Sequence, residues 1–165
     1  MADVGQNQIW AASSFCSPRG RFLTSGGMGT MGYALPAAIG AALSLHDAQK
    51  NAPVFVTVGD GGLSMSMAEL ATMKAQNLPL RILLLRNNTL GMIRDMKAPT
   101  TREDFVSLAG DPDFSLVAAA YGIPYLRIER DTQIPETISA LLAAEGPVFC
   151  ECIVREDEPT DSSRT

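Results

Sequence analysis

The 165-residue sequence has little histidine, cysteine, tryptophan or basic charge, and no long hydrophobic run. No apolar stretch reaches membrane-spanning length, and the N-terminus lacks the basic-then-apolar pattern of a signal peptide. A general nucleic-acid binder is not expected, because 13 Lys and Arg stand against 18 Asp and Glu, for a net charge of −5. With 46% apolar and 19% charged residues, the composition is typical of a globular chain of one domain.

The three cysteines, Cys16, Cys150 and Cys152, do not suggest a disulfide framework in their number or spacing. Cys150 and Cys152 flank Glu151 in an apolar run, so strand alternation places both on one face. Core packing is the simplest role for the cysteines, and a reactive or metal-binding role stays open as the alternative, although His46 is the only histidine. This cysteine usage predicts a reducing compartment and a cytoplasmic location.

Continuous apolar segments alternate with helical patterns along the chain. The predicted strands are 52–60, 78–85, 124–130 and 147–154, and the predicted helices are 31–48, 64–77, 113–122 and 132–146. Residues 21–27 are expected to form a short extended segment. Strands that are apolar on both faces and alternate with helices predict an α/β fold, a single domain whose parallel sheet is covered by helices on both faces.

The stretch "VGDGGLSMSMAEL", Val58 to Leu70, places one acid among three glycines at the end of a predicted strand. Ligands of open α/β sheets bind beyond the carboxyl ends of the strands, where glycines let backbone amides approach a phosphate. Asp60 would repel a phosphate unless a cation lay between them, and Mg²⁺ prefers such oxygen ligands. A plain strand-to-helix turn is the alternative, but it leaves Asp60 without a purpose.

The next predicted strand ends in "RNNTLGM", which brings Asn87 or Asn88 to the same sheet edge as Asp60. Together, "GDGG", "NLPLRILLLRNNTLGM", "DVGQNQIW" and "FLTSGGMGTMGYALPAAIGAA" resemble the diphosphate-binding domain of thiamine diphosphate enzymes of the acetolactate synthase group. The resemblance implies the thiamine diphosphate-binding fold over residues 3–154, a polar tail over 155–165, and thiamine diphosphate and Mg²⁺ as cofactors. The loop-like "DVGQ" at the start, with no strand before it, suggests a piece of a longer multidomain chain.

The resemblance also implies roles for individual residues. The Mg²⁺ ligands would be the side chains of Asp60 and Asn87 and the main-chain carbonyl of Thr89, with Asn88 an ordinary loop residue. Arg86 stands where the family usually has a first asparagine. The residues implied to contact the cofactor are Gly5, Gln6, Asn7, Gly29, Met31, Gly59, Asp60, Gly61, Gly62, Asn87, Thr89, Leu90, Gly91 and Met92.

These residues would contact the diphosphate, the pyrimidine ring and the bend between the two rings of the cofactor. The amides of Gly61, Gly62 and residues 90–92 would bind the diphosphate, and Gly5, Gln6 and Asn7 would close over it, with Asn7 in place of a usual histidine. The carbonyl of Gly29 would accept a hydrogen bond from the 4′-amino group of the pyrimidine. Met31 would be the apolar wedge that bends the cofactor into its V shape.

The implied activity is decarboxylation of a 2-keto acid with carboligation, as in branched-chain amino acid biosynthesis, by a transferase or lyase. A thiamine diphosphate-dependent decarboxylase of the sulfopyruvate or phosphonopyruvate type is the alternative, since Met96 replaces the tryptophan of the acetolactate pattern. A non-enzymatic nucleotide-binding module is disfavoured by Asp60 and Asn87. The expected partners are a small 2-keto acid, a pyrimidine-binding domain or subunit, and further copies of the chain, with no nucleic acid or membrane.

The activating glutamate of the resembling enzymes belongs to the pyrimidine-binding domain. Glu69 is expected to serve the helix after the glycine turn, and Glu103 and Asp104 to lie in a loop on the substrate side. No catalytic acid is therefore assigned within this sequence, and the isolated chain is expected to be inactive.

Overall fold

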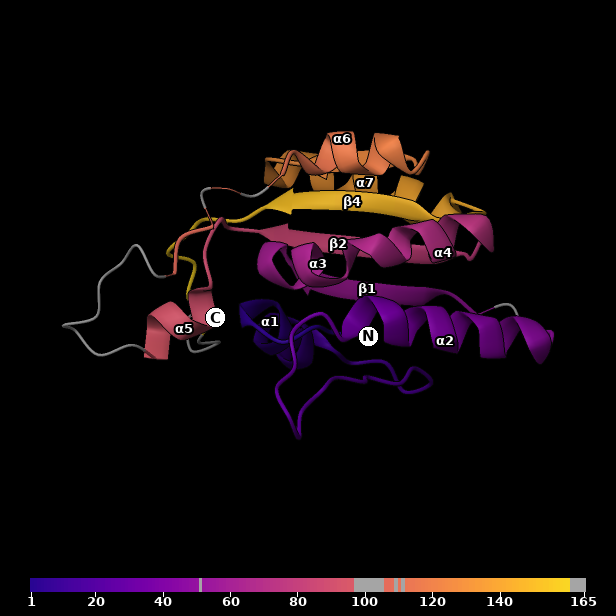
Figure 1. The fold of residues 1–165 in the computed structure, drawn as a ribbon, viewed down its shortest axis with the longest axis horizontal. Coiled ribbons are helices and arrows are strands. Elements are labelled where there is room, and N and C mark those ends of the chain that lie inside the picture. Colours follow the sequence, from indigo (N-terminus) through magenta and orange to yellow (C-terminus); the bar gives the residue numbers. More distant parts are fainter. Residues whose placement is uncertain (51, 97–105, 109, 111, 161–165) are drawn as a thin grey trace.

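A sheet of four parallel strands with helices against it forms the described part of the computed structural model, residues 1–50, 52–96, 106–108, 110 and 112–160 (Figure 1). The strands are β1 (Val54–Gly59), β2 (Leu80–Arg86), β3 (Tyr125–Ile128) and β4 (Val148–Ile153). The helices are α1 (Gln6–Ser14), α2 (Ala34–Asp47), α3 (Asp60–Ser66), α4 (Leu70–Ala75), α5 (Gly91–Met96), α6 (Phe114–Ala120) and α7 (Ile134–Ala143), with 3₁₀ turns η1 (Met67–Glu69) and η3 (Asp131–Gln133).

The strand order is β1-β2-β4-β3, and every neighbouring pair is parallel. In this register Gly59 of β1 lies opposite Leu85 of β2, close to the point where each strand leads into its loop or helix. The carboxyl ends of β1 and β2 therefore meet at one edge of the sheet. The predicted α/β fold with a parallel sheet is confirmed, and so are the four predicted strands.

Both faces of the sheet are covered, which explains why its strands are continuously apolar. The larger core cluster joins α2, α4 and α6 to β1 and β2, with Leu35, Met73 and Phe114 all buried. On the other face, Leu141 of α7 packs with residues of β3 and β4, including Cys150. The prediction of core packing thus holds for Cys150, whereas Cys16 is exposed and does not belong to the core.

Two local predictions were wrong, and two helices were missed. The helix expected over 64–77 is instead α3, η1 and α4 in succession: α3 already begins at Asp60, and the chain leaves helical geometry at Ser66, where φ is −132°. The segment 21–27 forms no strand and pairs only through a bridge between Thr24 and Ala2. Helices α1 and α5 were not predicted, because α1 carries few large apolar residues and α5 has only six residues.

The N-terminal residues hold the first loop against β1. The amide of Asp3 donates to the Thr57 carbonyl at 2.8 Å. The Asp3 carboxylate is fully buried and accepts hydrogen bonds from the amides of Gly32 at 2.9 Å and Ala34 at 2.8 Å, where α2 begins. A Cβ on Gly62 would lie 2.5 Å from Asp3 Oδ1. One glycine of the "GDGG" turn is therefore required by the packing of a buried carboxylate.

Residues 155–160 lie against α1 and α5. Trp10 Nε1 donates to the Pro159 carbonyl at 2.9 Å, and Arg94 Nη1 donates to the Glu156 carbonyl. The first part of the predicted polar tail thus contacts the two helices that the sequence did not reveal. Within the described ranges, none of the helices combines the length and apolarity needed to cross a membrane.

The packing at Gly62 generates a first prediction. Gly62 lies within α3, where helix propensity alone would favour alanine by about 1 kcal/mol. Because the new Cβ would meet the anchored Asp3 carboxylate, we expect Gly62→Ala to lower the free energy of unfolding by about 1–3 kcal/mol. Urea denaturation followed by circular dichroism measures the change.

Gly40→Ala is the matched control, because Gly40 is exposed in α2 and a Cβ there would have no atom within 4 Å beyond the adjacent residues and the helix's own backbone. This control should be neutral or stabilising. A Gly62→Ala protein as stable as the Gly40→Ala protein would contradict the close approach of Asp3 to Gly62.

Candidate functional site

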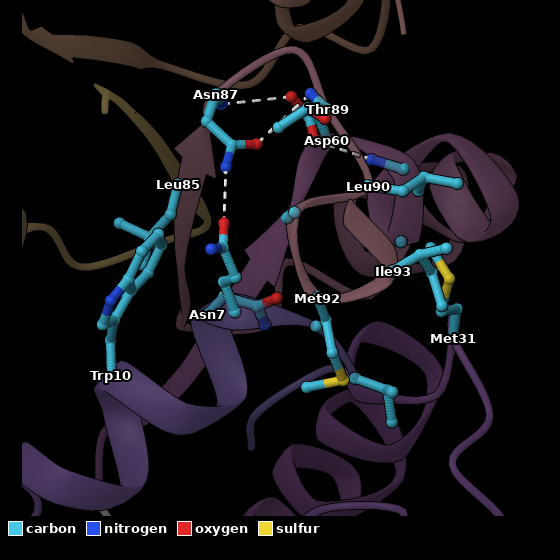
Figure 2. Close-up of a pocket in the computed structure, with 17 residues that line it drawn as sticks. Asn7, Trp10, Met31, Asp60, Leu85, Asn87, Thr89, Leu90, Met92 and Ile93 are labelled. Atoms are coloured by element: carbon cyan, nitrogen blue, oxygen red, sulfur yellow. Dashed lines mark hydrogen bonds between the residues drawn. The ribbon is translucent and has the colours of Figure 1, made fainter. Parts of the chain in front are cut away.

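Asp60 joins the ends of the neighbouring strands β1 and β2. Its carboxylate is 2% exposed, and Oδ1 accepts from the Gly61 amide at 3.0 Å. Oδ2 accepts from the amides of Asn87 at 3.2 Å and Asn88 at 2.6 Å, which follow β2. The predicted adjacency of Asp60 and Asn87 is confirmed. Figure 2 shows Asp60, Asn87 and Thr89 grouped at one end of the pocket.

The Asn87 side chain is fixed at both ends. Its Nδ2 donates to Gln6 Oε1 at 2.9 Å, and its Oδ1 accepts from the Thr89 amide at 3.3 Å. Thr89 is itself held by its hydroxyl, which donates to the Val106 carbonyl at 3.1 Å. The carboxylate oxygens of Asp60 and the amide oxygen of Asn87 thus lie in two neighbouring turns. Hydrogen bonds from backbone amides hold both side chains in place.

Gln6 connects this turn to α1 and α5. Besides accepting from Asn87, it donates through Nε2 to Asp95 Oδ2 at 2.8 Å. A Cβ on Gly91 would lie 1.8 Å from Gln6 Oε1, so any larger residue where α5 begins would displace the Gln6 side chain. The Asn7 side chain has a different role, because its Nδ2 donates inward to the carbonyls of Asp3 at 2.8 Å and Thr57 at 3.3 Å.

Several predicted diphosphate donors have partners within the chain. The Gly61 amide donates to Asp60 Oδ1, and the Leu90 amide donates to the Val106 carbonyl at 2.8 Å. Gly62 is the second residue after Asp60 in the first turn of α3, and Gly91 and Met92 open α5. The first amides of a helix have no carbonyl partner within the helix. Gly62, Gly91 and Met92 are thus the amides best placed to meet an anion.

A pocket lies between these elements, and almost every residue that the sequence predicted as a cofactor contact lines it. The predicted residues that line it are Gly5, Gln6, Asn7, Met31, Gly59, Asp60, Gly61, Gly62, Asn87, Thr89, Leu90, Gly91 and Met92. Gly29 does not line it and lies in the loop before α2 with φ +64°. Met31 reaches the glycine turn, since a Cβ on Gly61 would lie 3.1 Å from Met31 Cε and 2.9 Å from Leu90 Cδ2.

Sequence reasoning missed four residues of the lining: Val4, Trp10, Leu85 and Ile93. Trp10 and Ile93 come from α1 and α5, the helices without a clear sequence pattern, and Figure 2 shows them on different sides of the pocket. Leu85 could have been found by strand alternation, since its neighbour Leu84 is buried in the core on the opposite face.

The donor set fits a hard divalent cation held together with phosphate. The described residues contain no group of three or more His, Cys, Asp or Glu arranged to hold a metal. Mg²⁺ is usually bound through one or two protein carboxylates together with phosphate oxygens and water. Asp60 supplies one carboxylate, and Asn87 and the Thr89 carbonyl are the further oxygens at this turn.

Asp3 lies directly behind the turn and is the second buried carboxylate of this region. Burial raises the pKa of the Asp3 carboxyl above its usual range, and hydrogen bonds from the amides of Ala34, Gly32 and Val4 oppose that rise. Its oxygens accept from main-chain amides of the first loop and of α2. These hydrogen bonds hold the carboxylate against Gly62 of the glycine turn.

Comparison with known proteins agrees with this geometry. The sequence profile of the family described as "Thiamine pyrophosphate enzyme, C-terminal TPP binding domain" matches residues 3–152. The large subunit of acetolactate synthase isozyme 2 from Escherichia coli (strain K12) is 39% identical over 159 residues, which cover 94% of this chain and 28% of that protein. Chloroplastic acetolactate synthase 2 from Brassica napus is 40% identical over 163 residues, which cover 91% of this chain and 24% of that protein.

A solved structure has the same fold. An X-ray structure from Mycobacterium smegmatis described as a thiamin diphosphate-dependent enzyme superimposes with a TM-score of 0.69 and 26% sequence identity, over 81% of this chain and 24% of that chain. The chain thus spans about a quarter of the length of the relatives it matches. Because the family profile covers nearly the whole sequence, the chain belongs to the family of C-terminal TPP-binding domains of thiamine pyrophosphate enzymes.

Proposed function

We propose that the turns at Asp60 and Asn87 hold the Mg²⁺ and the diphosphate of thiamine diphosphate in an acetolactate synthase-like enzyme. The observation that carries this proposal is the contact between the Asp60 carboxylate and the amides that follow β2. It places one buried carboxylate and the Asn87 amide oxygen at the carboxyl edge of a parallel sheet, where ligands of such folds bind.

The residues of the two turns have the following proposed roles. Asp60, the Asn87 side chain and the Thr89 carbonyl would ligate Mg²⁺, and the amides of Gly62 and Gly91 would donate to the diphosphate. Gln6 keeps Asn87 oriented through its 2.9 Å hydrogen bond. When bound, thiamine diphosphate supplies a thiazolium ring that stabilises carbanion character, which is the chemistry required to decarboxylate a 2-keto acid.

The apolar side of the pocket would hold the rest of the cofactor. Met31 lies beside the glycine turn at Gly61 and lines the pocket, and this supports its role as the wedge against which the cofactor bends. Gly29 lies outside the pocket lining, and its carbonyl remains the proposed acceptor for the pyrimidine amino group. Trp10 and Ile93 extend the apolar lining.

The two relatives described above align with more than 90% of this chain and are acetolactate synthases by name. Their names support carboligation after decarboxylation and a place in branched-chain amino acid biosynthesis. We propose a 2-keto acid such as pyruvate as substrate, a pyrimidine-binding domain as the partner at the open side of the pocket, and a cytoplasmic location. Free Cys16, Cys150 and Cys152 fit a reducing compartment.

Asp60→Asn tests the cation site. The amide keeps the size of the side chain but removes its charge, so thiamine diphosphate affinity in the presence of Mg²⁺ should fall by at least about 10-fold, the loss typical for a group that a metal site needs. Calorimetric titration of the cofactor with and without Mg²⁺ measures the change. The control is Asp47→Asn, because the Asp47 side chain is 84% exposed and far along α2; equal affinity in both variants would remove Asp60 from the site.

The isolated chain should not turn over pyruvate. Asp60 is the one carboxylate among the described residues that line the pocket, and its proposed role is to bind the metal. Glu69 accepts a hydrogen bond from the Thr72 hydroxyl at 3.1 Å, and Glu103 and Asp104 lie outside the described residues. Product formation should appear only when a pyrimidine-binding domain with its glutamate is added. Substantial activity of the chain alone would show that the acid lies within it.

The chain should also associate with copies of itself or with a partner domain. Met28 and Met65 are 88% and 66% exposed, and Met96 is 77% exposed, so three large apolar side chains are open to solvent. Light scattering over a range of concentrations should give a mass above that of one chain. A constant monomer mass at high concentration would count against this expectation.

A further inference from the structure

A buried carboxylate, Glu151, lies in the sheet behind the proposed cation site. Glu151 is 1% exposed on β4, where it pairs with Leu84 of β2 in the sheet register. Its Oε1 accepts from Arg86 Nη1 at 3.0 Å, and its Oε2 accepts from the Tyr125 hydroxyl and lies 3.6 Å from Arg127 Nη1. Burying a carboxylate is costly unless its charge is paired and its oxygens are hydrogen-bonded, and this cluster does both.

Arg86 is the member of this cluster that reaches the site. It is the last residue of β2, directly before Asn87. Its guanidinium binds Glu151 through Nη1, donates through Nε to Asn88 Oδ1 at 2.8 Å, and lies 5.4 Å from the centre of the Phe114 ring. A planar guanidinium can make these contacts at once because its donors form a rigid fork.

Asn88 transmits the position of Arg86 to Asp60. The backbone of Asn88 is in the left-handed region, with φ +56°, which few residues other than glycine and asparagine adopt readily. In this conformation the Asn88 amide donates to Asp60 Oδ2 at 2.6 Å, while its side chain is held by Arg86. One unbroken series of hydrogen bonds therefore leads from Glu151 through Arg86 and Asn88 to Asp60.

The charges of the cluster suit a cation site nearby. An arginine beside a divalent cation would repel it, and the repulsion is stronger in a partly buried environment than in water. Glu151 balances that charge, and Arg127 is paired in turn with Glu129 at 2.8 Å. Burial and the neighbouring Glu151 carboxylate raise the pKa of the Tyr125 hydroxyl, so Tyr125 stays a neutral donor to the cluster.

We infer that Arg86 is a positioning residue for the cation site: anchored by the buried Glu151, it holds the Asn88 turn so that Asp60 and Asn87 present their oxygens together. Arg86 itself contacts neither metal nor cofactor in this role. The inference rests on the proposed function, because it assigns Arg86 to the same Mg²⁺ site.

Arg86→Lys tests this role, with Arg127→Lys as the matched control. Each variant keeps a positive charge near Glu151, but only Arg86 also binds the Asn88 side chain. In Arg86→Lys, the Mg²⁺ concentration that half-saturates thiamine diphosphate binding should rise by about 10- to 100-fold, the range found when supporting partners of metal ligands are removed. In Arg127→Lys the half-saturating Mg²⁺ concentration should change less than about twofold, because the hydrogen bond between Arg86 and Asn88 remains.

A second readout needs no ligand. The Asn88 amide is protected by Asp60, so its hydrogen exchange, measured by NMR without Mg²⁺ or cofactor, should be faster in Arg86→Lys and unchanged in Arg127→Lys. If the unaltered chain shows no Mg²⁺-dependent cofactor binding, the proposed function fails, and the exchange rate alone then decides the role of Arg86. Equal effects of the two lysine variants, or none in Arg86→Lys, overturn the inference.

Asn88→Gly covers the case in which Arg86→Lys does not fold. Glycine accepts the left-handed backbone and leaves the ion pair with Glu151 in place, but removes the oxygen that Arg86 binds. The half-saturating Mg²⁺ concentration should rise as in Arg86→Lys. In the double variant it should be little higher than in Asn88→Gly alone. A normal Mg²⁺ requirement in Asn88→Gly overturns the inference.

Discussion

The contact between the Asp60 carboxylate and the amides of Asn87 and Asn88 joins the adjacent strands β1 and β2 at their carboxyl ends. Because β1 and β2 are parallel, the segments that follow them leave the sheet at the same edge. The first polar side chain after β1, Asp60, therefore meets the amides that follow β2. The start of α3 and the left-handed turn at Asn88 meet at this contact, and Gln6 and the Thr89 amide fix the Asn87 side chain beside it. In the proposed function, the same contact brings the metal-binding oxygens together.

Close packing accounts for glycines that look like phosphate-binding glycines in sequence. Gly62 leaves space for the buried carboxylate of Asp3, which holds the first loop and the beginning of α2. Gly91 leaves space for Gln6, which joins α1, the Asn87 turn and α5. These positions bring helix-opening amides to the pocket lining and also allow side chains to pack against them, so glycine meets the structural requirement and suits the proposed binding role.

Two buried carboxylates lie behind the site and are stabilised by different means. Asp3 is surrounded by main-chain amides of the first loop and α2, whereas Glu151 is paired with two arginines and a tyrosine hydroxyl. Because the Asp3 carboxylate accepts from main-chain amides, it fixes the backbone of the first loop and of the start of α2 against the glycine turn. The ionic partners of Glu151 come from neighbouring strands, and one of them, Arg86, extends to the turn that follows β2.

Local patterns in the sequence were enough to predict the parallel α/β fold, its strands, and that Asn87 or Asn88 would reach the sheet edge at Asp60; the family resemblance selected Asn87. The patterns are continuous apolar strands, alternating helices, and the rule that parallel strands end at a common edge. A family resemblance added most of the pocket lining. Helices α1 and α5 carried no such pattern, so Trp10 and Ile93 were missed.

The side chains that support the site could be identified only from the tertiary packing. Gln6 and Asn87 are 81 residues apart, and Arg86 and Glu151 are 65 residues apart, yet each pair is hydrogen-bonded. No periodicity or motif links such positions, because side-chain contacts between distant segments depend on how strands are ordered and how helices pack. The inward direction of Asn7 has the same origin, because its Nδ2 donates to the carbonyls of Asp3 and of Thr57 on β1.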